Sequence, residues 1–174
     1  MAISLYDASV LSYLQILDAA QGFLQKGLDW CRGQGVDPEQ MVEACLFEDM
    51  RPFRFQVQQV AFHSAGTIAA MRSGVLTFGG ERPQHDYAGL QALLAEAAAE
   101  LRALSPAEVN GWEGKDVAFR VPGRDDRVFT AEGFLLSFSL PNFHFHATTA
   151  YDILRLRGVP VGKLDFMGAL RLKG

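Results

Sequence analysis

The sequence has few of the features that mark membrane, secreted or disulfide-stabilised proteins. Its two cysteines, Cys31 and Cys45, are too few and too far apart for a disulfide framework or a Cys-x-x-Cys site. It has no run of 18 or more apolar residues and no charged N-terminal segment followed by an apolar one. We therefore expect a cytoplasmic protein with no membrane partner.

Basic charge is also scarce. The 16 lysines and arginines are outnumbered by 20 aspartates and glutamates, which gives a net charge of −4. A phosphate-binding surface needs a basic field, so we expect no nucleic-acid partner. The chain also lacks G-x-G-x-x-G, P-loop, G-x-S-x-G and H-E-x-x-H motifs, which excludes the common nucleotide-binding and hydrolase classes.

The hydrophobic pattern is that of a helical protein. A length of 174 residues, 49% hydrophobic and 21% charged, is typical of one globular domain, which we place at residues 1–174. Apolar residues recur at three- and four-residue steps in four long segments. These predicted long helices are residues 5–32, 53–72, 87–104 and 131–157.

The connections suggest how the helices are ordered. Residues 75–85 contain Gly79, Gly80 and Pro83 and are predicted to be a loop, long enough to run the length of a neighbouring helix. Residues 115–121 and 127–130 flank a Pro-Gly-Arg-Asp-Asp turn and are predicted to form a β-hairpin. The expected fold is mainly all-α, an up-down-down-up four-helix bundle with a small β-hairpin before the last long helix.

Polar side chains interrupt the apolar side of the last helix. On a helical wheel, Asn142, His146 and Thr149 lie opposite the expected solvent side, which carries His144. A buried polar group left unpaired costs about 1–3 kcal/mol, so these three residues indicate a site or a network. Pro141 predicts either a kink in this segment or a restart of the helix near it.

A strand is the alternative for the Phe-His-Phe-His run at residues 143–146. A strand would put both histidines on one face and make a His-x-His metal pair. We prefer the helix, because the apolar spacing continues on both sides and the 27-residue segment 131–157 is too long for one strand.

The second long helix carries a row of polar residues of its own. Gln56, Gln59, His63 and Thr67 share one side of the wheel, between apolar flanks. Two interpretations remain open at this point. The row is either a solvent-exposed stripe on a helix at the edge of the bundle or a polar stripe that faces a cavity.

Three stretches of the chain resemble a known family. LPNFHFHATTAYDILRLRGVPVGKLDF, SLYDASV and MRPFRFQVQ are similar to an uncharacterised bacterial family that is grouped by fold with the DinB/YfiT-like bundles. That resemblance implies a four-helix bundle that holds a divalent metal ion with one histidine of the second helix and two from an H-x-x-x-H on the fourth. Some members of the wider group use the metal in thiol-dependent transferase or isomerase chemistry.

Carried onto this sequence, the resemblance implies a metal site at His63, Asn142 and His146, with asparagine at the first position of the H-x-x-x-H. Amide oxygen suits calcium or magnesium better than zinc or nickel. Gln56, Gln59 and Thr149 would line a ligand pocket beside it. The resemblance to similar bundles and the 13 phenylalanines also lead us to expect a homodimer.

Three functions follow from these residues. The first is a divalent-metal or small-ligand site between the second and fourth long helices. The second is a non-catalytic, self-associating bundle in which the same side chains form a buried hydrogen-bond network. The third is general acid-base work by His146 without a metal ion. The sequence identifies neither a substrate nor a certain cofactor.

Overall fold

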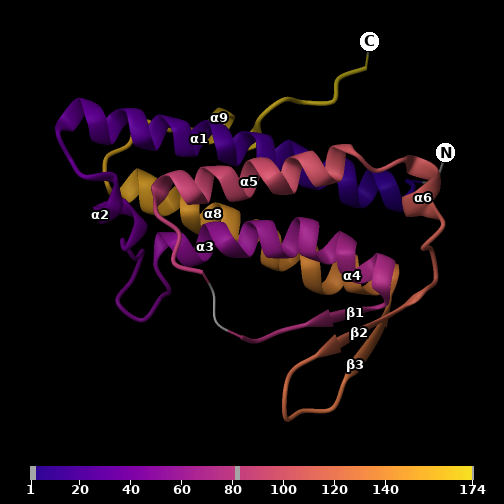
Figure 1. Cartoon of the computed structure of the whole chain (residues 1–174). Coiled ribbons are helices and arrows are strands. Elements are labelled where there is room, and N and C mark those ends of the chain that lie inside the picture. The colour runs from indigo at the N-terminus through magenta and orange to yellow at the C-terminus, as the bar shows by residue number, and fades with distance from the viewer. Residues whose placement is uncertain (1–2, 81–82, 174) are drawn as a thin grey trace.

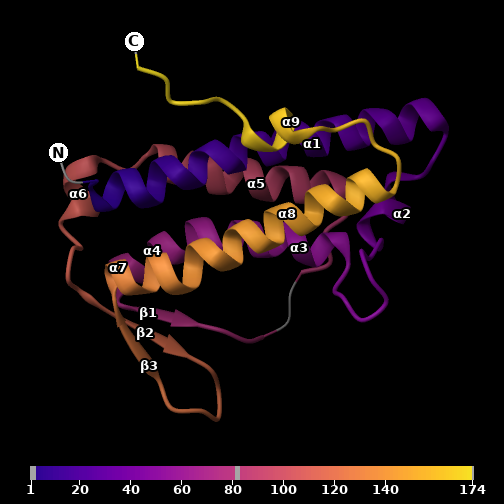
Figure 2. The same ribbon diagram turned by 180° about the vertical axis from the view of Figure 1, so that it is seen from behind.

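Four long helical rods dominate the computed structural model, which describes residues 3–80 and 83–173 (Figures 1 and 2). In three of the rods an α-helix is joined end to end with a π-helical turn, labelled η. The rods are η1 (Asp7–Leu11) with α1 (Ser12–Gln34); α3 (Phe53–Ala61), η2 (Phe62–Gly66) and α4 (Thr67–Ser73); α5 (Tyr87–Arg102); and α7 (Ala131–Phe134), η3 (Leu135–Ser139) and α8 (Leu140–Leu156). The short helices are α2 (Pro38–Val42), α6 (Pro106–Asn110) and α9 (Lys163–Met167).

The rods run up, down, down and up, as predicted (Figures 1 and 2). Helix α1 packs against α5 and α8, and α3 packs against the same two neighbours from the other side. The second and third rods run parallel to each other. This is possible because the connection after β1 (Val75–Thr77) returns along α3 to the start of α5 (Figure 1). Residues 81–82 of this connection, and residues 1–2 and 174 at the ends of the predicted domain, lie outside the described residues.

Side-chain caps begin four of the helices, α2, α5, α6 and α7. Asp37 accepts a hydrogen bond from the amide of Glu39, and Pro38 occupies the first turn of α2. Asp86 caps α5, Ser105 caps α6 and Thr130 caps α7 in the same manner. Gly35 ends α1 in the left-handed conformation that favours glycine.

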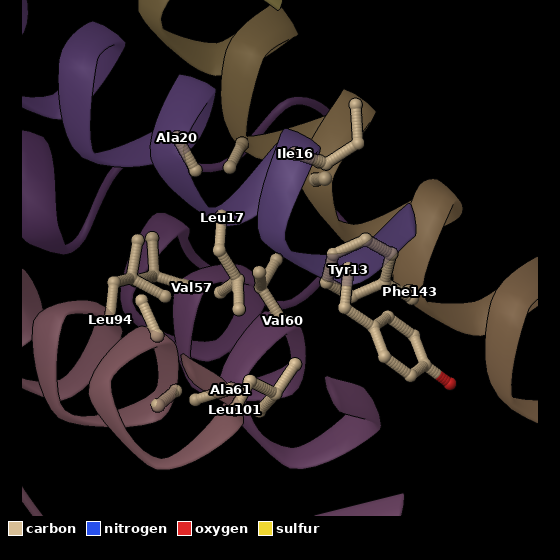
Figure 3. Packing of buried hydrophobic residues seen from close by; sticks show 14 of the residues in the cluster. Tyr13, Ile16, Leu17, Ala20, Val57, Val60, Ala61, Leu94, Leu101 and Phe143 are labelled. Carbon is tan, nitrogen blue, oxygen red and sulfur yellow. The ribbon is translucent and has the colours of Figure 1, made fainter. Parts of the chain in front are cut away.

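The core lies between the four rods and is aliphatic at its centre. Leu17 of α1, Val57 and Val60 of α3, and Leu94 of α5 point toward one another (Figure 3). Tyr13 packs edge to face on Phe143 of α8, with ring centroids 4.9 Å apart. Burial of such residues stabilises each by about 1.5–3 kcal/mol, so the shared apolar faces hold the rods together.

One glycine allows α1 and α5 to approach closely. The Tyr87 hydroxyl donates a hydrogen bond of 2.7 Å to the carbonyl of Leu24, and burial raises the pKa of Tyr87 well above its usual value. A Cβ atom at Gly27 would lie 2.5 Å from that hydroxyl and 3.1 Å from Leu154. Position 27 therefore accepts glycine only, unless the tyrosine moves.

The sheet differs from the predicted two-stranded hairpin. Strands β2 (Asp116–Arg120) and β3 (Arg127–Thr130) form the expected antiparallel pair, but β1 adds a third strand parallel to β2, with Leu76 beside Phe119. The prediction of a loop was therefore wrong for residues 75–77. A strand of three residues is too short for alternation to reveal it, and its pairing depends on contacts far along the chain.

The sheet covers one end of the bundle through its middle strand. Val117 and Phe119 of β2 are buried, and the Phe119 ring lies 4.7 Å from that of Phe138 in η3. The carbonyl of Lys115 accepts a hydrogen bond from the amide of Ala131, where β3 leads into α7. The sheet therefore fixes the start of the fourth rod.

Two of the π-helical turns, η2 and η3, meet at one buried hydroxyl group. Ser139 Oγ donates a 2.7 Å hydrogen bond to the carbonyl of His63 in η2, and it lies 2.6 Å from both Tyr13 Oη and Thr67 Oγ1. Burial raises the pKa of Tyr13 well above its usual value, so the phenol keeps its proton. Since a serine hydroxyl has one hydrogen and two lone pairs, Tyr13 and Thr67 donate to Ser139.

The fourth rod continues through Pro141 instead of stopping. The chain forms the π turn at Leu135–Ser139 just before the proline, which lies in the first turn of α8. A proline disturbs the preceding α-helical turn because it has no N–H group and its ring collides with the carbonyl four residues earlier. Pro141 lies in the first turn of α8, as the predicted restart has it, and the π turn before it joins α7 to α8 without a break in the rod.

The C-terminal segment packs on the bundle through one aromatic ring. Phe166 of α9 lies against Phe23 of α1 and Tyr151 of α8, and Lys26 pairs with Asp165 at 2.6 Å. Leu164 and Leu170 remain exposed. In residues 3–80 and 83–173, no helix has both the length and the apolar character that crossing a membrane requires.

Replacing Ser139 with alanine tests the hydroxyl cluster. Ser139→Ala leaves the Tyr13 and Thr67 hydroxyls and the His63 carbonyl without their shared partner, so the free energy of unfolding should fall by about 1–3 kcal/mol in urea titrations. Ser137→Ala, an exposed position in the same π turn, is the control and should change it by less than about 0.5 kcal/mol. Equal effects of the two substitutions would contradict the role of Ser139.

Candidate functional site

The two rows of polar residues predicted from the sequence come from neighbouring helices. Gln56 and Gln59 lie on α3 and His63 on η2, while Asn142, His146 and Thr149 lie on α8, which packs against α3. The α3 row is internal, since Gln56, Gln59, His63 and Thr67 are each at most 3% exposed. The interpretation of this row as a solvent-exposed stripe was therefore wrong.

The imidazole rings of His63 and His146 face each other across the α3 and α8 rods. Their centroids are 5.7 Å apart and their planes differ by 11°. His63 is buried, whereas His146 is partly exposed. The run at residues 143–146 is helical, so the strand alternative, with its His-x-His pair, was wrong.

Gln56 determines that the Nδ1 atom of His146 carries a hydrogen. The Gln56 Nε2 group donates a 2.8 Å hydrogen bond to the carbonyl of Arg51, which can only accept, so Oε1 is the atom that faces His146. His146 Nδ1 lies 2.7 Å from this Oε1 and must carry the proton. In the neutral ring, Nε2 then holds the lone pair that a metal ion or a hydrogen-bond donor uses.

Asn142 and Thr149 turn toward their own helix. Asn142 Nδ2 donates a 2.7 Å hydrogen bond to the carbonyl of Phe138, and Thr149 Oγ1 donates a 2.8 Å hydrogen bond to the carbonyl of Phe145. Neither side chain is hydrogen-bonded to the α3 row within the described residues. The structure thus brings together Gln56, His63 and His146 of the predicted set and leaves Asn142 with Oδ1 as its remaining acceptor.

Aromatic rings surround the histidine pair. Phe55 and Phe145 contact His146, at centroid distances of 5.9 and 5.2 Å, while Phe62 and Phe138 contact His63, at 5.1 and 5.5 Å. Phe145 is 56% exposed, so this surround has a solvent-facing edge. Apolar walls weaken screening by water, so polar interactions at the two imidazoles are stronger than on an open surface.

Sequence reasoning missed Ser139, which holds the His63 turn in place. Its hydrogen bond to the His63 carbonyl joins η2 to η3. The available signal was a serine within the apolar stretch 131–157. A helical wheel with 3.6 residues per turn does not assign it a partner, because π turns shift the register.

His144 lies on the exposed side of α8, away from this pair. Its ring contacts that of Phe143, with centroids 5.4 Å apart. The partial burial lowers the pKa of His144 below its usual value. It is therefore a neutral surface imidazole at neutral pH and not part of the site.

The donor set can be compared with what a metal ion requires. Two imidazoles on one tetrahedral ion have ring centres about 5–6 Å apart, given metal–nitrogen distances of about 2.1 Å, and the 5.7 Å separation of His63 and His146 lies in this range. Their planes differ by only 11°, so one ring has to turn before both in-plane lone pairs point at the same ion. In residues 3–80 and 83–173, no three His, Cys, Asp or Glu side chains are grouped to share an ion. The residues therefore fit a weak site with two imidazoles and not a firmly held ion.

An up-down-down-up bundle of four long helices with a small sheet at one end is a DinB-like fold. A family model described as "Domain of unknown function (DUF1993)" matches residues 5–167, and the chain belongs to this family. The crystal structure of a DinB family member protein from Shewanella denitrificans is similar over 98% of this chain and 95% of that one, with a TM-score of 0.80 and 26% identity. No curated protein matches the chain.

The histidine tautomer can be measured directly. Long-range ¹H–¹⁵N NMR spectra should show His146 protonated at Nδ1, and Gln56→Leu should shift it toward the Nε2-protonated form because the acceptor is lost. The His144 signals serve as the internal control and should stay unchanged. An Nε2-protonated His146 in the unsubstituted protein would show that the hydrogen bond to Gln56 is absent.

Proposed function

We propose that this protein binds a divalent transition-metal ion weakly and reversibly through His63 and His146. The observation that carries the proposal is the pair of facing imidazoles, 5.7 Å apart, one of which is oriented by Gln56. A ligating histidine typically donates its second ring N–H group to an oxygen atom, as His146 does to Gln56 Oε1. When bound, the ion would supply Lewis acidity to a small ligand at its remaining coordination positions.

The surrounding residues have separate roles in this proposal. Gln56 holds the His146 ring with Nε2 as the donor atom, and Ser139 holds the backbone of the turn that carries His63. Asn142, one helical turn before His146, offers its amide oxygen, which suits imidazole-preferring metals poorly. The partly exposed His146 and the exposed Phe145 give the access route from solvent.

A second candidate is supported by the hydrogen bonds inside the chain. Asn142 and Thr149 both bond to carbonyl groups of their own helix, and His146 bonds to Gln56. A satisfied polar network of this kind specifies how two helices pack. In that case the residues stabilise a non-catalytic bundle, and any function lies in contacts with a partner or with a second copy of the chain.

Replacing Asn142 with histidine, so that three imidazoles are present with His63 and His146, separates the two candidates. Protein purified without a metal-affinity tag should bind zinc or nickel weakly in calorimetric titrations, and Asn142→His should raise the affinity at least about tenfold by adding a third imidazole. Ser137→His places an imidazole on the exposed side of the same rod, seven residues before His144, and is the matched control. His146→Ala should abolish the gain in the Asn142→His background.

Metal binding no stronger than that of the control would contradict the proposed metal site. If neither the unsubstituted protein nor Asn142→His binds zinc or nickel above the Ser137→His control, the imidazoles do not converge on an ion. The hydrogen-bond network is then the function of these residues. Circular dichroism of each variant would show that a loss of binding does not come from a loss of fold.

A further inference from the structure

A hollow lies between the second and third rods. It has a volume of about 360 Å³ and lies between α3–η2 and α5, bordered by Pro83 and His85 of the connection to α5. This volume is at the lower end of the range for small-molecule sites, about 300–1,000 Å³. Its apolar lining consists of Ala61, Phe62, Ala65, Leu93 and Ala97.

Gln58 brings a buried polar group to this hollow. The side chain is only 7% exposed, and its Nε2 group donates to the carbonyl of Pro83 at 2.7 Å and to His85 Nδ1 at 2.9 Å. Because a carbonyl can only accept, the bond to Pro83 fixes which end of the amide is nitrogen. Both amide hydrogens are used, and Oε1 has no hydrogen bond within residues 3–80 and 83–173. The lining therefore includes an accessible amide oxygen to which a bound donor could bond.

The same bonds set the state of His85. Because an amide nitrogen can only donate, His85 Nδ1 accepts from Gln58 and the ring hydrogen is on Nε2.

Two carboxylates complete the lining. Glu96 and Glu100 lie one turn apart on α5, both exposed, and like charges at this spacing repel each other. Neither pairs with a lysine or arginine in the part of the chain that the structure describes. A cation held between them would relieve the repulsion, and an apolar body attached to it would cover the alanine-rich floor.

We infer that this hollow binds a small organic ammonium ion with an apolar tail. The ammonium group pairs with Glu96 and Glu100 and donates to Gln58 Oε1, and the tail lies on Ala61, Ala65 and Ala97. All three polar partners of the ammonium group are acceptors, so an anionic ligand does not fit. The site does not use His63 or His146, so it stands independently of the metal proposal.

Hexylammonium chloride is the probe for this inference, with hexan-1-ol as its uncharged match. In ¹H–¹⁵N NMR titrations, hexylammonium should shift the amide signals of Ala61, Ala65 and Ala97, with saturation at about millimolar concentration. Hexan-1-ol should bind at least about tenfold more weakly, because it lacks the charge that the carboxylates recognise. The double substitution Glu96→Gln and Glu100→Gln should weaken hexylammonium binding by about the same factor.

Two further variants sharpen the test. Glu113→Gln changes the charge of an exposed residue outside the hollow and should leave binding unaltered. Ala65→Leu fills the floor without changing any charge and should abolish binding. The inference is overturned if hexylammonium causes no saturable shift, if hexan-1-ol binds equally well, or if the double substitution has no effect. Tighter binding of acetyl-lysine amide than of hexylammonium would assign the hollow to a protein side chain and overturn the small-molecule inference.

Discussion

The Ser139 hydroxyl is the contact on which the geometry of this bundle depends. It accepts from Tyr13 of the first rod and Thr67 of the second, and it donates to the backbone of His63. These groups are buried in a largely apolar interior, so each pays a desolvation penalty unless all are satisfied together. The cluster holds the first, second and fourth rods in one register, because a shift of one along another would leave these buried groups unpaired. The position of His63 opposite His146 follows from that register.

Most of the architecture could be predicted from the sequence. Helical spacing and the caps at Asp86 and Thr130 locate the rods, and the length of the connection after residue 74 permits the second and third rods to run parallel. Strand β1 was not predicted, because three residues carry no periodic signal and its partner strand β2 lies about 40 residues further along the chain. The π turns were not predicted either, since a helical wheel assumes one fixed angle per residue.

The candidate site could be predicted in part. Spacing alone put Gln56 and His63 on one side of the second rod and His146 on the inner side of the fourth, where the structure has them. Spacing could not tell that Gln56 fixes the His146 tautomer, because that depends on a backbone carbonyl at Arg51. Nor could it tell that Asn142 bonds to Phe138, since a short polar side chain on a helix has its own carbonyls within reach. The resemblance to DinB-like proteins indicated the histidines, whereas the hollow beside Gln58 came from the structure alone.

The π turn at Phe62–Gly66 has a consequence for comparing relatives. A π turn contains one residue more than an α-helical turn, and each residue rotates a helix by about 100°. The wide turn absorbs that extra residue, so a homologue without it would show a one-position gap while the helix before the gap keeps the same side toward the fourth rod. Whether the gap falls before or after position 63 therefore decides whether a relative's histidine corresponds to His63.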